Sequence, residues 1–259
     1  MRQRLDLRYI RPEYPLDAPT LRYRRARESF WRVNDLVLDF AEYHRRRGML
    51  AYKKKESDPW QPVGRDFRMF VPTEVALEVS ELLYNLRVAL DYVMYALFTQ
   101  ALADARVTAE DFEKRHTRIS FPILQDERAF VAWRKDSSWI EPERVKLIEG
   151  VRPFEHPMLL LGPEYHYLDK HRDLPSLAAD FDLTGGKVLP GPPWASDDER
   201  LKAEAAGTAG PTGWYVGAKV AVSFPDGSPL VETLETLLGR VDGLIEDLWP
   251  VLNERLPDK

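Results

Sequence analysis

The feature that most constrains this chain is a long apolar run, LLYNLRVALDYVMYAL, at residues 82–97. The run belongs to a longer segment, 73–103, in which apolar residues recur every three or four positions, and this spacing predicts an α-helix. The inner stripe of this helix is expected to hold Val79, Leu83, Leu86, Leu90, Val93 and Leu97. A helix that is apolar around most of its circumference has to be buried, so the rest of the chain is expected to pack around it.

Three polar residues, Asn85, Arg87 and Asp91, interrupt this run. Arg87 and Asp91 are four positions apart, so their side chains can pair directly on a helix. A buried ion pair seldom adds net stability, because both charges lose their hydration. It can instead fix one arrangement of the fold, or it can hold a binding site, and the sequence leaves both interpretations open.

Three tyrosines, Tyr84, Tyr92 and Tyr95, lie on or beside the helix face that carries these polar residues. Convergent aromatic and charged side chains in an apolar wall are typical of a ligand pocket. The tyrosines are therefore candidate pocket residues, next to the polar candidates Asn85, Arg87 and Asp91.

The remaining elements predict an α+β fold, in which long helices pack with a small antiparallel sheet. The pattern indicates helices at 20–47, 126–135 and 141–149, a further helix from Pro163, a hairpin of 49–56 with 65–71, strands at 176–183 and 213–224, and a C-terminal helix to about residue 254. The chain is expected to form a single domain, 1–259. Its parts are a basic N-terminal helical segment (1–47), a core (48–183 and 213–254) and a flexible loop (184–212) rich in glycine and proline.

A second polar cluster follows in HPMLLLGPEYHYLDKHRDL, residues 156–174. Asp169 and Arg172 share one face of the helix expected there. We expect them, together with His171, to meet Arg87 and Asp91 in a buried and mutually satisfied network. His166 and Asp169 have the spacing of metal ligands, but the cations beside them argue against a metal site.

The composition excludes several classes of protein. The 259 residues include no cysteine, which rules out a disulfide framework, a thiol nucleophile and a cysteine metal site. No apolar stretch reaches the roughly 18 residues of a membrane span, and the start of the chain does not resemble a signal peptide. The glycine-rich phosphate-binding motifs of nucleotide enzymes are also missing. We therefore expect a soluble cytoplasmic protein without a cofactor.

Charge is distributed unevenly along the chain. Residues 1–55 hold 15 Lys and Arg against 7 Asp and Glu, whereas the remainder holds 22 against 35. A basic segment of this kind can contact RNA phosphates, and the candidate contacts are Arg22, Arg24, Arg25, Arg45, Arg46 and Arg47. The alternative is that this segment lies across the acidic part of the same molecule or of a second copy in a homodimer.

Four short motifs resemble those of a group of bacterial proteins. They are YNLRVALDY (84–92), FPI (121–123), HPM (156–158) and DKHR (169–172). The group carries H-N-L-R-S-A-L-D-H, F-P-I, H-P-L and D-K-H-R in the same order, before a final sheet and helix. The resemblance covers residues 48–254 and implies no particular activity.

The first motif also resembles, more distantly, the R-x4-6-H signature of HEPN domains, which are helical modules of RNA-cleaving toxins and defence proteins. Arg87 matches the arginine of that signature, but Tyr92 stands where it has histidine. Tyr84 replaces the other histidine of the group, and a phenol is a poor proton shuttle near neutral pH. No catalytic residue is therefore assigned, although His171 could substitute in space.

Two functions follow as hypotheses. The first is a non-catalytic module that binds a partner protein or a small ligand, with a structural network of Arg, Asp and His side chains. The alternative is a HEPN-like RNA-binding protein or ribonuclease in stress or phage defence. It would use Arg87, Asp91, His171 and Arg172, brought together in space, with the basic segment 22–55 contacting phosphate.

Overall fold

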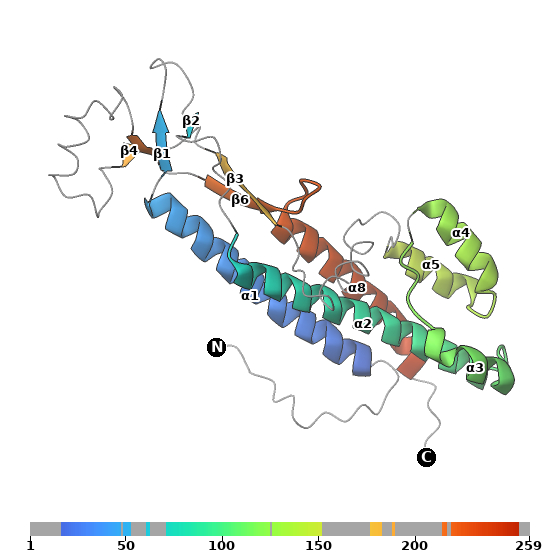
Figure 1. The fold of residues 1–259 in the computed structure, drawn as a ribbon. Coiled ribbons are helices and arrows are strands. Elements are labelled where there is room, and N and C mark those ends of the chain that lie inside the picture. The colour runs from blue at the N-terminus through green and yellow to red at the C-terminus, as the bar shows by residue number, and fades with distance from the viewer. Residues whose placement is uncertain are drawn as a thin grey trace, which may run out of the picture. The chain divides into compact units, whose positions relative to one another are not determined.

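The computed structural model confirms an α+β fold that is mostly helical, with small antiparallel sheets and a C-terminal helix (Figure 1). It describes residues 17–47, 49–52, 61–62, 71–124, 126–151, 177–182, 188–189, 214–216 and 219–253. Side chains at 46–52, 61–62, 182, 188–189, 214–216, 251 and 253 are outside this description. The helices are α1 (Asp17–Arg47), α2 (Thr73–Ala103), α3 (Ala109–Arg115), the 3-10 helix η2 (His116–Arg118), α4 (Glu127–Asp136), α5 (Pro142–Gly150) and α8 (Leu230–Asn253).

The chain forms two compact units, each assembled from separate stretches of sequence. The first unit comprises Met1–Phe30, Val79–Leu174 and Leu234–Lys259, and the second comprises Trp31–Glu78 and Pro175–Thr233. The boundaries fall inside α1, α2 and α8, so each of these helices contributes residues to both units.

The first unit is built on its portions of α1, α2 and α8. Its part of α2 carries the expected inner stripe, and Leu86 and Leu90 are completely buried. Tyr23 of α1 is also buried and hydrogen-bonds to Asp242 of α8. Burial, reinforced by the Asp242 carboxylate, raises the pKa of Tyr23 above its usual range. The phenol therefore stays protonated and donates its hydrogen bond across the α1–α8 contact.

A Schellman motif ends α2, with alanine where glycine is usual. The N–H of Arg106 donates to the carbonyl of Ala101 (2.8 Å), and the N–H of Ala105 donates to that of Leu102 (3.1 Å). Ala105 accordingly has a positive φ of 56°. Just beyond, Val107 is buried with Phe98 and Ala101, and this cluster packs against Phe112, Ile119 and Trp139.

Short helices follow α2, and two of them begin at a side-chain cap. Thr108 accepts a hydrogen bond from the N–H of Asp111 (3.1 Å) at the start of α3, and Asp126 accepts one from that of Ala129 (2.7 Å) at the start of α4. These oxygens satisfy backbone donors that a first helical turn leaves unpaired. Helix α5 instead begins with Pro142, which needs no such partner.

The second unit contains the strands. One sheet has the order β2-β1-β5-β4, from Gln61–Pro62, Met49–Tyr52, Trp214–Val216 and Val188–Leu189. The other pairs β3 (Ala178–Asp182) with β6 (Lys219–Ser223) in antiparallel register, from Ala178 opposite Ser223 to Asp182 opposite Lys219. His44 of α1 lies edge-on to Phe181 of β3, with ring centres 5.7 Å apart. Burial lowers the pKa of His44.

A tight turn joins β6 to α8. The N–H of Gly227 donates to the carbonyl of Phe224, and the N–H of Phe224 donates to that of Ser228, both at 2.9 Å. The hydroxyl of Ser228 donates to Asp226 at 2.6 Å and its N–H at 2.9 Å, which lowers the pKa of Asp226. Gly227 has a φ of +84°, a conformation that side chains disfavour.

Ala105 and Gly227 give a pair of predictions with opposite signs. We expect Gly227→Ala to lower the free energy of unfolding by about 1 kcal/mol, because a Cβ there meets open space and only the backbone is strained. Ala105→Gly should raise it by about 0.5–1 kcal/mol by relieving the same strain. Urea titrations measure both changes, and two shifts of the same sign would contradict the backbone explanation. Gly239→Ala, in α8, is the control: it should stabilise by up to about 1 kcal/mol through helix propensity.

The structure differs from the sequence pattern in three details. Strand β1 pairs with β2, at 61–62, and with β5, and the sequence pattern predicts neither pairing; residues 65–70 of the predicted second strand lie outside the described part of the chain. The single strand expected at 213–224 is two strands, β5 and β6, in different sheets. The pattern also misses α3, which buries none of its residues and so has no apolar stripe.

Other predicted segments are only partly described. Within 184–212, the expected loop, the structure describes Val188 and Leu189, which form β4. The helix expected from Pro163 lies outside the described residues.

Candidate functional site

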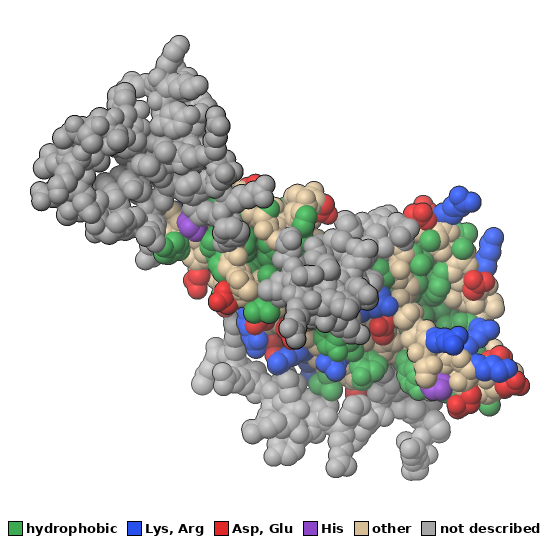
Figure 2. Space-filling model, viewed as in Figure 1, with side chains coloured by type: hydrophobic (Ala, Val, Ile, Leu, Met, Phe, Trp, Pro, Cys, Tyr) green, Lys and Arg blue, Asp and Glu red, His purple; other side chains and the backbone are tan. Residues whose placement is uncertain are grey.

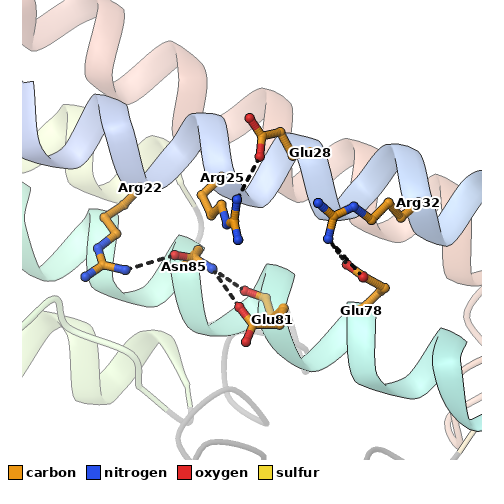
Figure 3. Close-up of polar contacts among 7 residues, drawn as sticks. All are labelled: Arg22, Arg25, Glu28, Arg32, Glu78, Glu81 and Asn85. Carbon is orange, nitrogen blue, oxygen red and sulfur yellow. Dashed lines mark hydrogen bonds and ion pairs between the residues drawn. The ribbon is translucent and has the colours of Figure 1, made fainter. Parts of the chain in front are cut away.

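The candidate site lies along α2, and its first polar residue, Asn85, is buried against α1 (Figure 3). Asn85 is only 2% exposed. The amide oxygen accepts a hydrogen bond from Nη1 of Arg22 at 3.2 Å. The amide nitrogen donates to the backbone carbonyl of Glu81 (2.8 Å) and to its Oε2 (3.3 Å). The buried amide is therefore satisfied on both sides, and it fixes α1 against α2 at one axial position.

Further ion pairs accompany this contact. Within the first unit, Arg25 pairs with Glu28 one turn along α1 (3.1 Å; Figure 3). Within the second unit, Arg32 of α1 pairs with Glu78 of α2 (3.1 Å). These pairs are partly exposed, so we expect each to contribute at most about 1 kcal/mol.

Arg87 and Asp91 form the predicted ion pair, and Asp91 has a second partner that the sequence pattern does not reveal. Nε of Arg87 donates to Oδ2 of Asp91 at 3.1 Å. The other carboxylate oxygen, Oδ1, accepts the backbone N–H of Phe121 at 2.8 Å. The side chains of Arg87 and Asp91 are 17% and 34% exposed. Asp91 therefore bridges a side chain of α2 and the backbone of the segment that follows η2.

This bridge connects two of the four motifs. Asp91 belongs to YNLRVALDY and Phe121 opens FPI, thirty positions later. Phe121 is buried, at 1% exposure, so the hydrogen bond to its N–H and the packing of its side chain both anchor this residue. Both oxygens of Asp91 are occupied by donors, which suits a positioning role rather than proton transfer.

The expected convergence with Asp169, His171 and Arg172 stays a prediction, because these residues lie outside the described part of the chain. Nη1 of Arg87 is buried and has no hydrogen-bond partner among the described residues. Pairing this nitrogen with the Asp169 carboxylate would satisfy it.

The three tyrosines point outward. Tyr84, Tyr92 and Tyr95 are 37%, 40% and 42% exposed, whereas the leucines on the opposite side of α2 are buried. Steps of three and four residues join these tyrosines to two other side chains in one outward stripe, which we call the tyrosine face: Glu81, Tyr84, Val88, Tyr92 and Tyr95. Glu81 is exposed and Val88 is half-buried. Tyr95 also contacts the ring of Phe112 in α3, with 6.3 Å between ring centres.

Three of the six arginines suggested as RNA contacts are engaged by other side chains. The contacts are Arg22 with Asn85, Arg25 with Glu28, and Arg45 with Glu42 at 2.6 and 2.7 Å. Arg24 is exposed, and the side chains of Arg46 and Arg47 lie outside the described residues. Figure 2 shows acidic and basic side chains intermixed over the described part of the visible face. These neighbours reduce the positive potential that a polyanion would meet.

The described residues form neither a metal cluster nor a membrane-spanning helix. In the described ranges, no three His, Asp or Glu side chains lie close enough together to hold a metal ion. The ring of His116 stacks on that of Phe112, and its Nδ1 lies 3.1 Å from the carbonyls of Phe112 and Glu113. None of the described helices is both long and apolar enough to cross a membrane.

Comparisons with protein-family models, with curated proteins and with solved structures gave no match.

Proposed function

We propose that the chain is a non-catalytic interaction module. In this proposal the polar residues of α2 hold the fold in one arrangement, and the tyrosine face of the same helix receives a partner protein. The observation that carries this proposal is the burial pattern of α2. The polar residue Asn85 is buried, whereas the aromatic residues Tyr84, Tyr92 and Tyr95 are exposed. A helix that only supported the core would be expected to turn charged side chains, not aromatic ones, toward water.

The composition of the tyrosine face supports a protein partner. Tyrosine is enriched and lysine, glutamate and aspartate are depleted at protein interfaces relative to other surfaces. Four of the five residues of this face are tyrosine or valine, and only Glu81 is charged. An outward stripe on a long helix is also suited to another protein surface rather than to a small ligand, which needs a concave site.

The ribonuclease alternative requires Arg87 to reach an RNA phosphate. Its side chain is 17% exposed, and its Nε is bound to Asp91. Tyr92, at the position of the catalytic histidine in the HEPN signature, lies on the exposed face. A mostly buried, paired guanidinium and an exposed phenol therefore favour the interaction module over a shared phosphate site for these two side chains.

A photo-crosslinking experiment tests the proposal. The photoreactive amino acid benzoylphenylalanine replaces Tyr92 in one variant and Tyr43, which is 49% exposed on α1, in the control. After irradiation of cells that produce each full-length chain, we expect defined protein adducts from position 92 and none from position 43. Position 92 giving no adduct, or both positions giving the same adducts, would contradict an interaction role for the face.

A companion assay addresses the alternative directly. The purified chain is incubated with labelled single-stranded RNA at low and moderate salt, beside Arg87→Ala. We expect intact RNA throughout and no steep loss of binding with salt, which phosphate contacts would produce. Cleavage that disappears in the folded Arg87→Ala variant would replace the interaction module with a ribonuclease.

A further inference from the structure

We infer that the partner of the tyrosine face is a second copy of this chain, packed antiparallel about a twofold axis that passes through Val88. The inference rests on the proposed function and adds the identity and geometry of the partner. It starts from the spacing of the exposed residues on α2, not from their composition alone.

The tyrosine face is symmetric about Val88. Tyr84 and Tyr92 lie four residues on either side of it, and Glu81 and Tyr95 lie seven residues on either side. In an antiparallel pair of identical helices centred on this residue, Val88 meets Val88 of the second copy. Tyr84 then faces Tyr92, and Glu81 faces Tyr95. A partner of different sequence would place no such symmetry requirement on the face.

Chemical complementarity follows from the same register. The exposed Glu81 carboxylate is a hydrogen-bond acceptor, and the Tyr95 hydroxyl is a donor when protonated. The antiparallel arrangement forms this donor–acceptor pair twice, once at each end of the interface. The two facing pairs of tyrosine rings would cover the half-buried valines between them, as an apolar centre within a polar rim.

A parallel arrangement would lose this complementarity. Each residue would then face its own copy, and Glu81 would oppose Glu81, which is a repulsion between like charges. The two Tyr95 hydroxyls would meet each other instead of a carboxylate. The charge on the face therefore selects the antiparallel orientation.

Substitutions of opposite charge at Val88, the residue on the twofold axis, test the inference. A residue on the axis contacts itself, so Val88→Arg and Val88→Glu should each place two like charges in contact and yield monomers. An equimolar mixture of the two folded variants should restore the dimer through an Arg–Glu contact. Light scattering and analytical ultracentrifugation from about 1 to 100 µM should give twice the 30.0 kDa chain mass for the unmodified protein and for the mixture.

Three further variants keep the test decisive. Val131→Arg, at a 49% exposed valine of α4, should remain dimeric. Tyr95→Phe removes the hydroxyl that faces Glu81 at both ends of the interface, so two hydrogen bonds are lost and dimerisation should weaken about thirtyfold, whereas Tyr43→Phe should not weaken it. A monomeric unmodified protein, or a mixture of the Val88 variants that stays monomeric, would overturn the inference. If the Tyr92 crosslink then captured a different protein, the interaction module would stand without self-association; if it captured none, both would fail.

Discussion

Replacing Asp91 by alanine is expected to lower the free energy of unfolding by about 2–3 kcal/mol. The substitution removes the only described partner of the Arg87 Nε and the acceptor of the Phe121 N–H at once. Arg87 would retain a mostly buried charge without its counter-ion, which costs more than the pair itself contributes. We place the loss below the range for fully buried pairs because Asp91 is 34% exposed. Urea unfolding followed by circular dichroism measures the change.

Two variants separate the roles of Asp91. Asp91→Asn retains an oxygen for the Phe121 N–H but loses the charge, so it should lower the free energy of unfolding by roughly half as much. Asp39→Ala removes an exposed carboxylate from α1 and should change it by less than about 0.5 kcal/mol. If Asp91→Ala behaved like Asp39→Ala, the bridge between α2 and the FPI segment would have no structural importance.

The second large effect is expected at the opposite side of α2. Leu86 is completely buried, and Leu86→Ala should lower the free energy of unfolding by about 2–5 kcal/mol through lost apolar burial and the cavity left behind. Leu77, on the same helix, is 48% exposed, so Leu77→Ala should cost less than about 0.5 kcal/mol. The ratio of the two effects measures how strictly α2 is divided into an inner and an outer side, and equal losses would contradict this division.

The sequence pattern predicts the long helices because their apolar stripe repeats over many turns. Thirty-one residues of three- and four-residue periodicity define α2, and the closing helix carries an equally regular stripe. Short elements carry less information: two-residue strands such as β2 have no period to detect, and α3 has no buried side. A strand prediction across 213–224 also cannot indicate that the chain changes sheets between β5 and β6.

For the site, the pattern predicts local pairs and misses distant ones. The Arg87–Asp91 pair follows from i to i+4 spacing, which is a property of the helix alone. The distant partners of Asn85 and Asp91, which are Arg22 and Phe121, lie 63 and 30 positions away, and nothing in the local sequence marks them. Helical spacing likewise places the tyrosines together but cannot decide whether they line a pocket or face water. Their exposure depends on what packs around α2, which only the tertiary structure supplies.

The way the chain threads α1, α2 and α8 through both units has a consequence for dissecting the protein. Neither unit corresponds to a continuous stretch, so no fragment made with one start and one stop can contain one unit without parts of the other. Truncation would remove the apolar partners of a surviving helix and leave its core stripe in water. Long-range contacts must also form before either unit is complete, a topology associated with slow folding. Point substitutions in the full-length chain are therefore the suitable way to assign roles to individual surfaces.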